Sequence, residues 1–161
     1  MATIVSAPAD LLVATSDGID VRFAGIVLRA RFPSRPGYPR GGTGLGVRLA
    51  GVRGPETQRR DNLFLDAREM WAERLKTEGP DAAAGPPTMP GVPVLERVQA
   101  TVSDDIDTAY RLIAGRVAGD GTEWDAAWIY APAPPDTAGR LTLQFTLDGA
   151  PTGKECEIRL H

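Results

Sequence analysis

Glycine and proline are so frequent in this chain that they restrict its fold more than any other feature. The 161 residues include 18 Gly and 14 Pro. Proline removes a backbone donor and glycine lowers helix propensity, so a bundle of long helices is excluded. Short segments separated by turns remain, and they favour a fold built mainly of β-strands.

Between the turns, apolar and polar side chains alternate with a period of two, which is typical of β-strands. In the clearest run, 140–147, Leu141, Leu143, Phe145 and Leu147 share one face. The other expected strands are 11–14, 19–32, 45–49, 62–65, 94–102, 108–117, 123–131 and 155–160. Such closely spaced short strands predict a sandwich or a barrel.

We predict a mainly β protein, formed as a single antiparallel β-sandwich domain over residues 1–161, with a small antiparallel β-barrel as the alternative. The side-chain parity slips at Ala24–Gly25, which predicts a β-bulge there. The side chains expected in the core include Phe23, Leu49, Leu141, Leu143, Phe145 and Ile158.

One short helix is predicted at about 66–78. Asp66 and Glu69 have the spacing of a capping box, and Gly79–Pro80 gives a stop signal. The apolar residues at helical spacing are Ala67, Met70, Trp71 and Leu75. We expect this stripe to lie on a sheet or to close one end of a barrel.

Charge and reactive side chains exclude several classes of function. The net charge of −3 and a pI of about 5.2 leave no overall positive field for nucleic acid, so no nucleic-acid partner is expected. With Cys156 as its single cysteine, the chain cannot build a disulfide framework or a thiolate zinc site. The single histidine, His161, is the last residue, so no Cys–His or Ser–His–Asp catalytic set is predicted. No catalytic residue, metal or cofactor is predicted.

The sequence predicts a location in the cytoplasm. No apolar run approaches the length of a membrane span, and the first residues lack the basic segment of a secretion signal. A membrane partner is therefore not expected.

Two long loops, 33–43 and 79–93, are the segments in which we expect recognition, because a rigid sheet leaves its loops free to vary. In the first, Tyr38 lies between Arg35 and Arg40, and these three residues are candidate partner-binding groups. Deletion of 81–88 from the second is expected to leave the fold intact.

Trp124 and Trp128 share one face of the expected strand 123–131. They are interpreted as core anchors, and the sharper alternative is an aromatic shelf for a flat ligand. The acidic run 104–107 is interpreted as a turn in which Asp side chains bond the nearby backbone, with a calcium loop as the alternative.

The C-terminal part of the chain, 94–160, resembles a known group of proteins. The similar segments are 102–110 with its Asp-rich turn, 121–125 with Trp124, the Pro-rich 130–135 and the Leu-Thr-Leu strand at 140–143. They resemble uncharacterised actinobacterial proteins with an immunoglobulin-like β-sandwich. The resemblance implies an immunoglobulin-like fold and supplies no catalytic residues.

These observations favour a non-enzymatic binding or assembly module, whose partner is another protein or a second copy of the chain. The alternative is a β-barrel that binds a small molecule, such as a biosynthetic cyclase-like or isomerase-like enzyme. A cavity between the sheets lined by Trp124 and Trp128 would favour the alternative.

Overall fold

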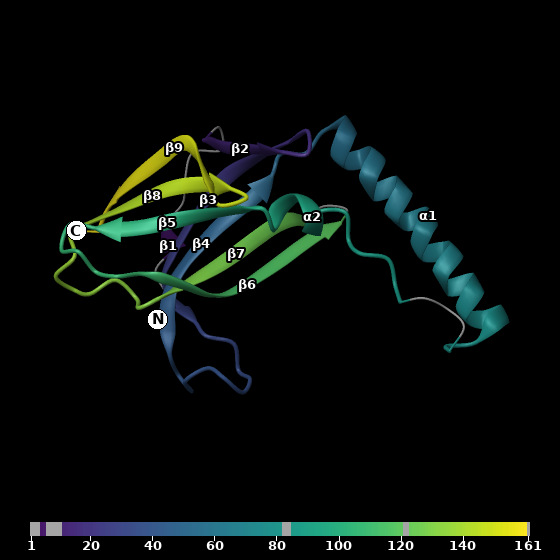
Figure 1. Cartoon of the computed structure of the whole chain (residues 1–161), viewed down its shortest axis with the longest axis horizontal. Coiled ribbons are helices and arrows are strands. Elements are labelled where there is room, and N and C mark those ends of the chain that lie inside the picture. The colour runs from purple at the N-terminus through teal and green to yellow at the C-terminus, as the bar shows by residue number, and fades with distance from the viewer. Residues whose placement is uncertain (1–3, 6–10, 82–84, 121–122, 161) are drawn as a thin grey trace.

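The computed structural model shows a two-sheet β protein with a projecting helix (Figure 1). It describes residues 4–5, 11–81, 85–120 and 123–160. The strands are β1 (Ile4–Val5), β2 (Leu12–Ser16), β3 (Ile19–Arg31), β4 (Thr43–Gly51), β5 (Val98–Asp104), β6 (Arg111–Asp120), β7 (Glu123–Ala131), β8 (Arg140–Leu147) and β9 (Ala150–Arg159). The helices are α1 (Pro55–Glu78) and α2 (Val92–Leu95).

The strands form two separate antiparallel sheets. In the larger sheet the order is β1-β3-β4-β7-β6, with β2 also paired to β3, and in the smaller it is β5-β8-β9. The described strands do not close into a barrel. The prediction of a mainly β sandwich is confirmed, and the barrel alternative is wrong.

Side chains from both sheets fill the core. The rings of Phe23 on β3 and Phe145 on β8 lie 5.5 Å apart between centroids and are tilted by 51°. All six side chains expected in the core are buried. The predicted bulge is also present, because the β3–β4 register shifts between Phe23 and Gly25, where glycine takes a φ of +117°.

The inward row of β7 contacts the backbone of the opposite sheet. The Trp128 indole donates to the carbonyl oxygen of Val98 at 2.8 Å. The Tyr130 hydroxyl accepts from the Ala100 amide at 3.1 Å and donates to the Ala100 carbonyl oxygen at 2.6 Å. Since β5 is an edge strand, these groups satisfy buried backbone positions that no strand partner reaches.

Two of the expected strands are partly or wholly wrong. Residues 62–65 belong to α1, and the expected strand 94–102 is divided between α2 and β5. Val94 is buried as expected, but from a helical turn. The short apolar runs in both segments have no alternation long enough to separate a strand from a helix.

Helix α1 begins well before the predicted Asp66. It starts at Pro55, and the Gly54 amide donates to the Thr57 hydroxyl at 2.9 Å. Proline fits the first turn of a helix because its missing N–H would have no helical partner there. The predicted capping box at Asp66 is therefore inside the helix, whereas the end at Gly79 is confirmed.

Most of α1 extends beyond the sandwich (Figure 1). Its buried side chains are Thr57, Asp61 and Phe64, all in its first half. Met70 is 67 % exposed and Leu75 is 36 % exposed. Met70 and Leu75 of the apolar stripe therefore do not lie on a sheet or close a barrel, and the fully buried side chains of α1 are all near its start.

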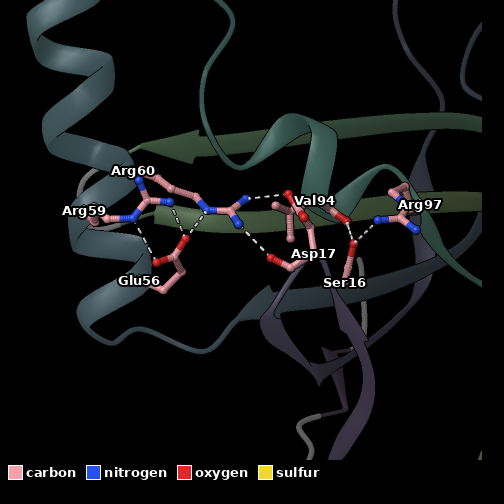
Figure 2. A network of polar contacts seen from close by, with 7 residues as sticks. All are labelled: Ser16, Asp17, Glu56, Arg59, Arg60, Val94 and Arg97. Atoms are coloured by element: carbon pink, nitrogen blue, oxygen red, sulfur yellow. Dashed lines mark hydrogen bonds and ion pairs between the residues drawn. The ribbon is translucent and has the colours of Figure 1, made fainter.

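Polar contacts fix the start of α1 (Figure 2). Arg60 donates to the Asp17 carboxylate at 3.0 Å and to the Asp17 carbonyl oxygen at 2.7 Å. Its Nε also pairs with Glu56 at 3.0 Å. The Trp124 indole donates to Asp61 at 3.0 Å from β7. The β2–β3 turn and β7 thus hold the first two turns of the helix.

The same β2–β3 region continues the network toward the smaller sheet (Figure 2). The Ser16 hydroxyl donates to the Val94 carbonyl oxygen at 2.7 Å, and Arg97 donates to Ser16 at 3.5 Å. Arg97 also pairs with Asp148 in the β8–β9 turn at 2.6 Å. Hydrogen bonding from Arg97 lowers the pKa of Asp148.

The projecting helix changes the expected result of deleting 81–88. A helix of 24 residues is about 36 Å long, and the following chain returns to the sandwich, where the Gly91 amide donates to Gly119 at 2.9 Å. After the deletion four residues remain between Glu78 and Gly91, and this connection spans at most about 18 Å. The end of α1 would therefore have to unwind, so tolerance of this deletion is no longer expected.

Phe145→Ala is expected to lower the free energy of unfolding by about 3–5 kcal/mol, because it leaves a cavity against Phe23 in a closed core. Thermal or urea unfolding measures the change. Leu65→Ala, at a side chain 45 % exposed, is the control and should cost far less. Equal melting temperatures for wild type and Phe145→Ala would contradict the described packing.

Glu56 should report on the anchor of α1. Hydrogen bonds from Arg59 and then Arg60 lower its pKa from 4.5 to about 2. The ionised form therefore stabilises the fold above pH 4.5, and this contribution is lost as the pH falls from 4.5 to about 2. Carboxyl NMR should show titration near the lower value, and Arg59→Gln should move it upward. Titration of wild-type Glu56 near 4.5 would contradict these contacts.

Candidate functional site

The loop between β3 and β4 brings the predicted residues Arg35, Tyr38 and Arg40 together. All three line one surface hollow of about 530 Å³, together with Phe32 and the prolines of the loop. The loop extends from the end of the larger sheet (Figure 1). The sequence prediction thus identified three side chains that share a single surface.

The base of this loop is closed by its backbone and by an aromatic ring. The Phe32 amide donates to the Gly42 carbonyl oxygen at 3.0 Å, and the Gly42 amide donates to Pro39 at 3.2 Å. The Phe32 ring lies directly over Gly42, where a Cβ atom would collide with it. Gly44 lies equally close to the Tyr130 carbonyl oxygen. The glycine-rich segment therefore allows the hairpin to pack tightly, and it leads into a strand as predicted.

Tyr38 fixes the tip of the loop. Its hydroxyl donates to the carbonyl oxygen of Ile113 at 3.2 Å, in the bulged part of edge strand β6. The guanidinium of Arg35 lies over the Tyr38 ring, 5.4 Å from its centroid, and contacts the hydroxyl at 3.5 Å. These contacts hold one arginine and one aromatic ring in a defined arrangement.

The ion pairing of the hairpin arginines determines the charge of this surface. No carboxylate of the described residues pairs with Arg31, Arg35 or Arg40. Other exposed arginines of the described chain, such as Arg48 and Arg116, are likewise unpaired, whereas Arg97 pairs with Asp148. The hairpin therefore presents positive charge that the protein does not neutralise.

Sequence reasoning missed Arg31 and the extent of this positive surface. The signal is present in the sequence, because residues 21–55 contain no Asp or Glu. The arginines in this segment are Arg22, Arg29, Arg31, Arg35, Arg40, Arg48 and Arg53. A net charge averaged over the chain hides them, since the remaining residues are strongly acidic.

Trp124 and Trp128 lie apart from the hairpin surface, in the core. They are 2 % and 8 % exposed, and both indole N–H groups have partners, in Asp61 and in Val98. The core-anchor interpretation is confirmed. Neither ring has a face free for a ligand shelf, because both pack within the core cluster.

The acidic run 104–107 forms a turn, as interpreted. One Asp104 oxygen accepts from the amides of Ile106 at 3.0 Å and Thr108 at 2.9 Å, and the other accepts from the Tyr110 hydroxyl at 2.8 Å. Burial alone would raise the pKa of Asp104, but these hydrogen bonds outweigh it and lower the pKa. Burial and the same carboxylate raise the pKa of Tyr110. The Asp104 oxygens are thus occupied by the turn itself.

The described residues contain no group of three or more His, Cys, Asp and Glu placed to hold a metal ion. Cys156 is half-buried on β9, and burial raises the pKa of its thiol, which disfavours the reactive thiolate. His161 lies outside the described residues.

The second candidate loop, 79–93, is only partly described, and its last residues belong to α2. Gly91 packs against Gly119 so closely that a Cβ atom on either would collide with the other backbone. Met89 is half-buried. This end of the loop serves to attach the chain to β6.

Comparisons with family models, with curated proteins and with solved structures gave no match. The immunoglobulin-like resemblance therefore stays a prediction. In the described part of the chain, no helix has the length and apolar character needed to cross a membrane.

Proposed function

We propose that the protein is a non-enzymatic binding module and that the β3–β4 hairpin is its recognition surface. The observation that carries the proposal is the hollow formed by Arg35, Tyr38 and Arg40, in which neither arginine pairs with a carboxylate of the described residues. Its lining supports binding rather than acid–base catalysis, because the described lining residues include no carboxylate, histidine or cysteine.

The scaffold supports this role. The hairpin is carried by β3 and β4, which pair with each other. The other edge of β4 pairs with β7, so β4 lies inside the larger sheet. The loop tip is held by Tyr38 on β6. A surface fixed at its base and its tip loses little conformational freedom when a partner binds.

The alternative function, a small-molecule enzyme in a barrel, has less support. It required a closed barrel with a cavity near Trp124 and Trp128, whereas the sheets form a sandwich and both rings are buried in its core. The function that we propose is therefore the binding of another protein. We propose that this takes place in the cytoplasm.

The test is capture of partners from a native lysate by the immobilised protein and by a triple variant, Arg35→Ser, Tyr38→Ser and Arg40→Ser. Proteins retained by wild type should be lost from the triple variant. The matched control is Arg74→Ser, Leu75→Ser and Lys76→Ser, at exposed positions near the end of α1.

Both triple variants should stay folded and unfold cooperatively, since all six side chains lie outside the core cluster. The control should retain the same proteins as wild type. An identical set of proteins on all three samples would contradict the assignment of recognition to the hairpin.

A further inference from the structure

The positive surface extends beyond the loop hollow. A second hollow of about 730 Å³ lies along the base of the hairpin, and Arg29 and Arg31 are in its wall. The two hollows share Phe32, Ser34 and Gly41 in their linings, so both lie against the same hairpin. We call the two hollows together the hairpin groove.

The hairpin groove carries a net positive charge. Its described lining residues include four arginines and no carboxylate. Arg29 pairs with Asp136 at 3.2 Å, whose side chain is 93 % exposed, while Arg31, Arg35 and Arg40 have no carboxylate partner in the described chain. Guanidinium groups pair in a bidentate manner with carboxylates and phosphates, so the complementary ligand is an anion.

The walls between the arginines are apolar. Val27, Ala30 and Phe32 line the base of the groove, and Pro33, Pro36 and Pro39 line the loop. A ligand that matches the whole groove therefore alternates negative groups with apolar ones. An extended polypeptide in which acidic and apolar residues alternate places its carboxylates on one side, toward the arginines, and its apolar side chains on the other, toward Phe32 and the prolines.

A nucleic acid fits the groove less well. Base recognition by such surfaces uses free aromatic faces. Here the Tyr38 ring has Arg35 on one face and its hydroxyl is bound to Ile113, so Tyr38 is not free to stack on a base at that face.

We infer that the hairpin groove binds an extended acidic segment of a partner protein, with carboxylates on Arg31, Arg35 and Arg40 and apolar side chains against Phe32. The inference rests on the proposed function and adds the chemistry of the partner. Each exposed ion pair contributes only a modest binding free energy, so the affinity comes from several pairs together. It should fall as the salt concentration rises.

The experiment measures fluorescence anisotropy with a labelled peptide of about twelve residues, about 40 Å when extended, in which Glu and Leu alternate. Wild type should bind it, and a peptide with Gln in place of Glu should not bind. Raising NaCl from about 50 mM to about 500 mM should weaken binding, because these exposed charges are screened.

The variant Arg31→Gln, Arg35→Gln and Arg40→Gln should weaken binding at least about tenfold, since three charge pairs are lost together. The matched control Arg74→Gln, Lys76→Gln and Lys154→Gln removes the same charge at exposed sites away from the groove and should bind like wild type. Equal melting temperatures show that both variants are folded.

No binding of the Glu–Leu peptide, or equal weakening by both variants, would overturn the acidic-segment assignment. So would tighter, groove-dependent binding of a single-stranded oligonucleotide or of phosphatidylserine vesicles, which would assign the groove to another ligand class. If the Glu–Leu peptide does not bind, but the variant with Ser at positions 35, 38 and 40 still loses the proteins that wild type captures, the proposed function stands. In that case only the partner chemistry is wrong.

Discussion

The fold depends on hydrogen bonds that side chains of β7 make to the backbone of β5. β5 is the edge of the smaller sheet, yet Val98 and Ala100 are buried. A buried backbone group without a partner costs free energy comparable to a lost hydrogen bond. Trp128 and Tyr130 supply these partners from the other sheet, so they fix how the two sheets face each other.

The same strand also positions the functional surface. Tyr130 pairs with Leu45 of β4 and with Leu112 of β6. β4 forms the base of the hairpin, and β6 accepts the hydrogen bond from Tyr38 at the tip of the loop. Gly44 packs on its carbonyl oxygen. The residue that joins the sheets therefore lies beside the hairpin, so the proposed recognition surface is attached to a strand that is held from both sides.

Alternation was sufficient to predict a mainly β fold and its core, because it records which side chains are buried, but it left both a sandwich and a barrel open. It predicted Phe23, Phe145 and Ile158 in the core. It could not show that Tyr130 and Trp128 bond to β5, because that contact depends on the distance between two sheets and on no local pattern.

The helix shows a different limit of sequence reasoning. The stripe that includes Met70 and Leu75 correctly indicated a helix, but periodicity does not say what covers an apolar face. Its start was missed because 62–65 was predicted as a strand and Asp66 as the cap, whereas the helix begins at Pro55, and proline is common in the first turn of helices.

For the candidate site, Arg35, Tyr38 and Arg40 were predicted from the sequence, whereas Arg31 was not. The composition of the whole chain, with a net charge of −3, concealed a local segment that has no acidic residue. Charge counted over a window of the length of a hairpin would have detected it. That both hollows are lined by Phe32 depends on the fold of the loop and is visible only in the structure.

Hydrogen exchange of the Ala100 amide, measured in wild type and in Tyr130→Phe, tests most directly whether β7 secures the edge of β5. The substitution removes one oxygen and leaves both polar groups of Ala100 without a partner. Exchange should become at least about tenfold faster, with a loss of about 1–3 kcal/mol in the free energy of unfolding. Tyr38→Phe, which removes a hydroxyl at the loop tip, should leave the Ala100 amide unchanged. Unaltered exchange and stability in Tyr130→Phe would contradict the account.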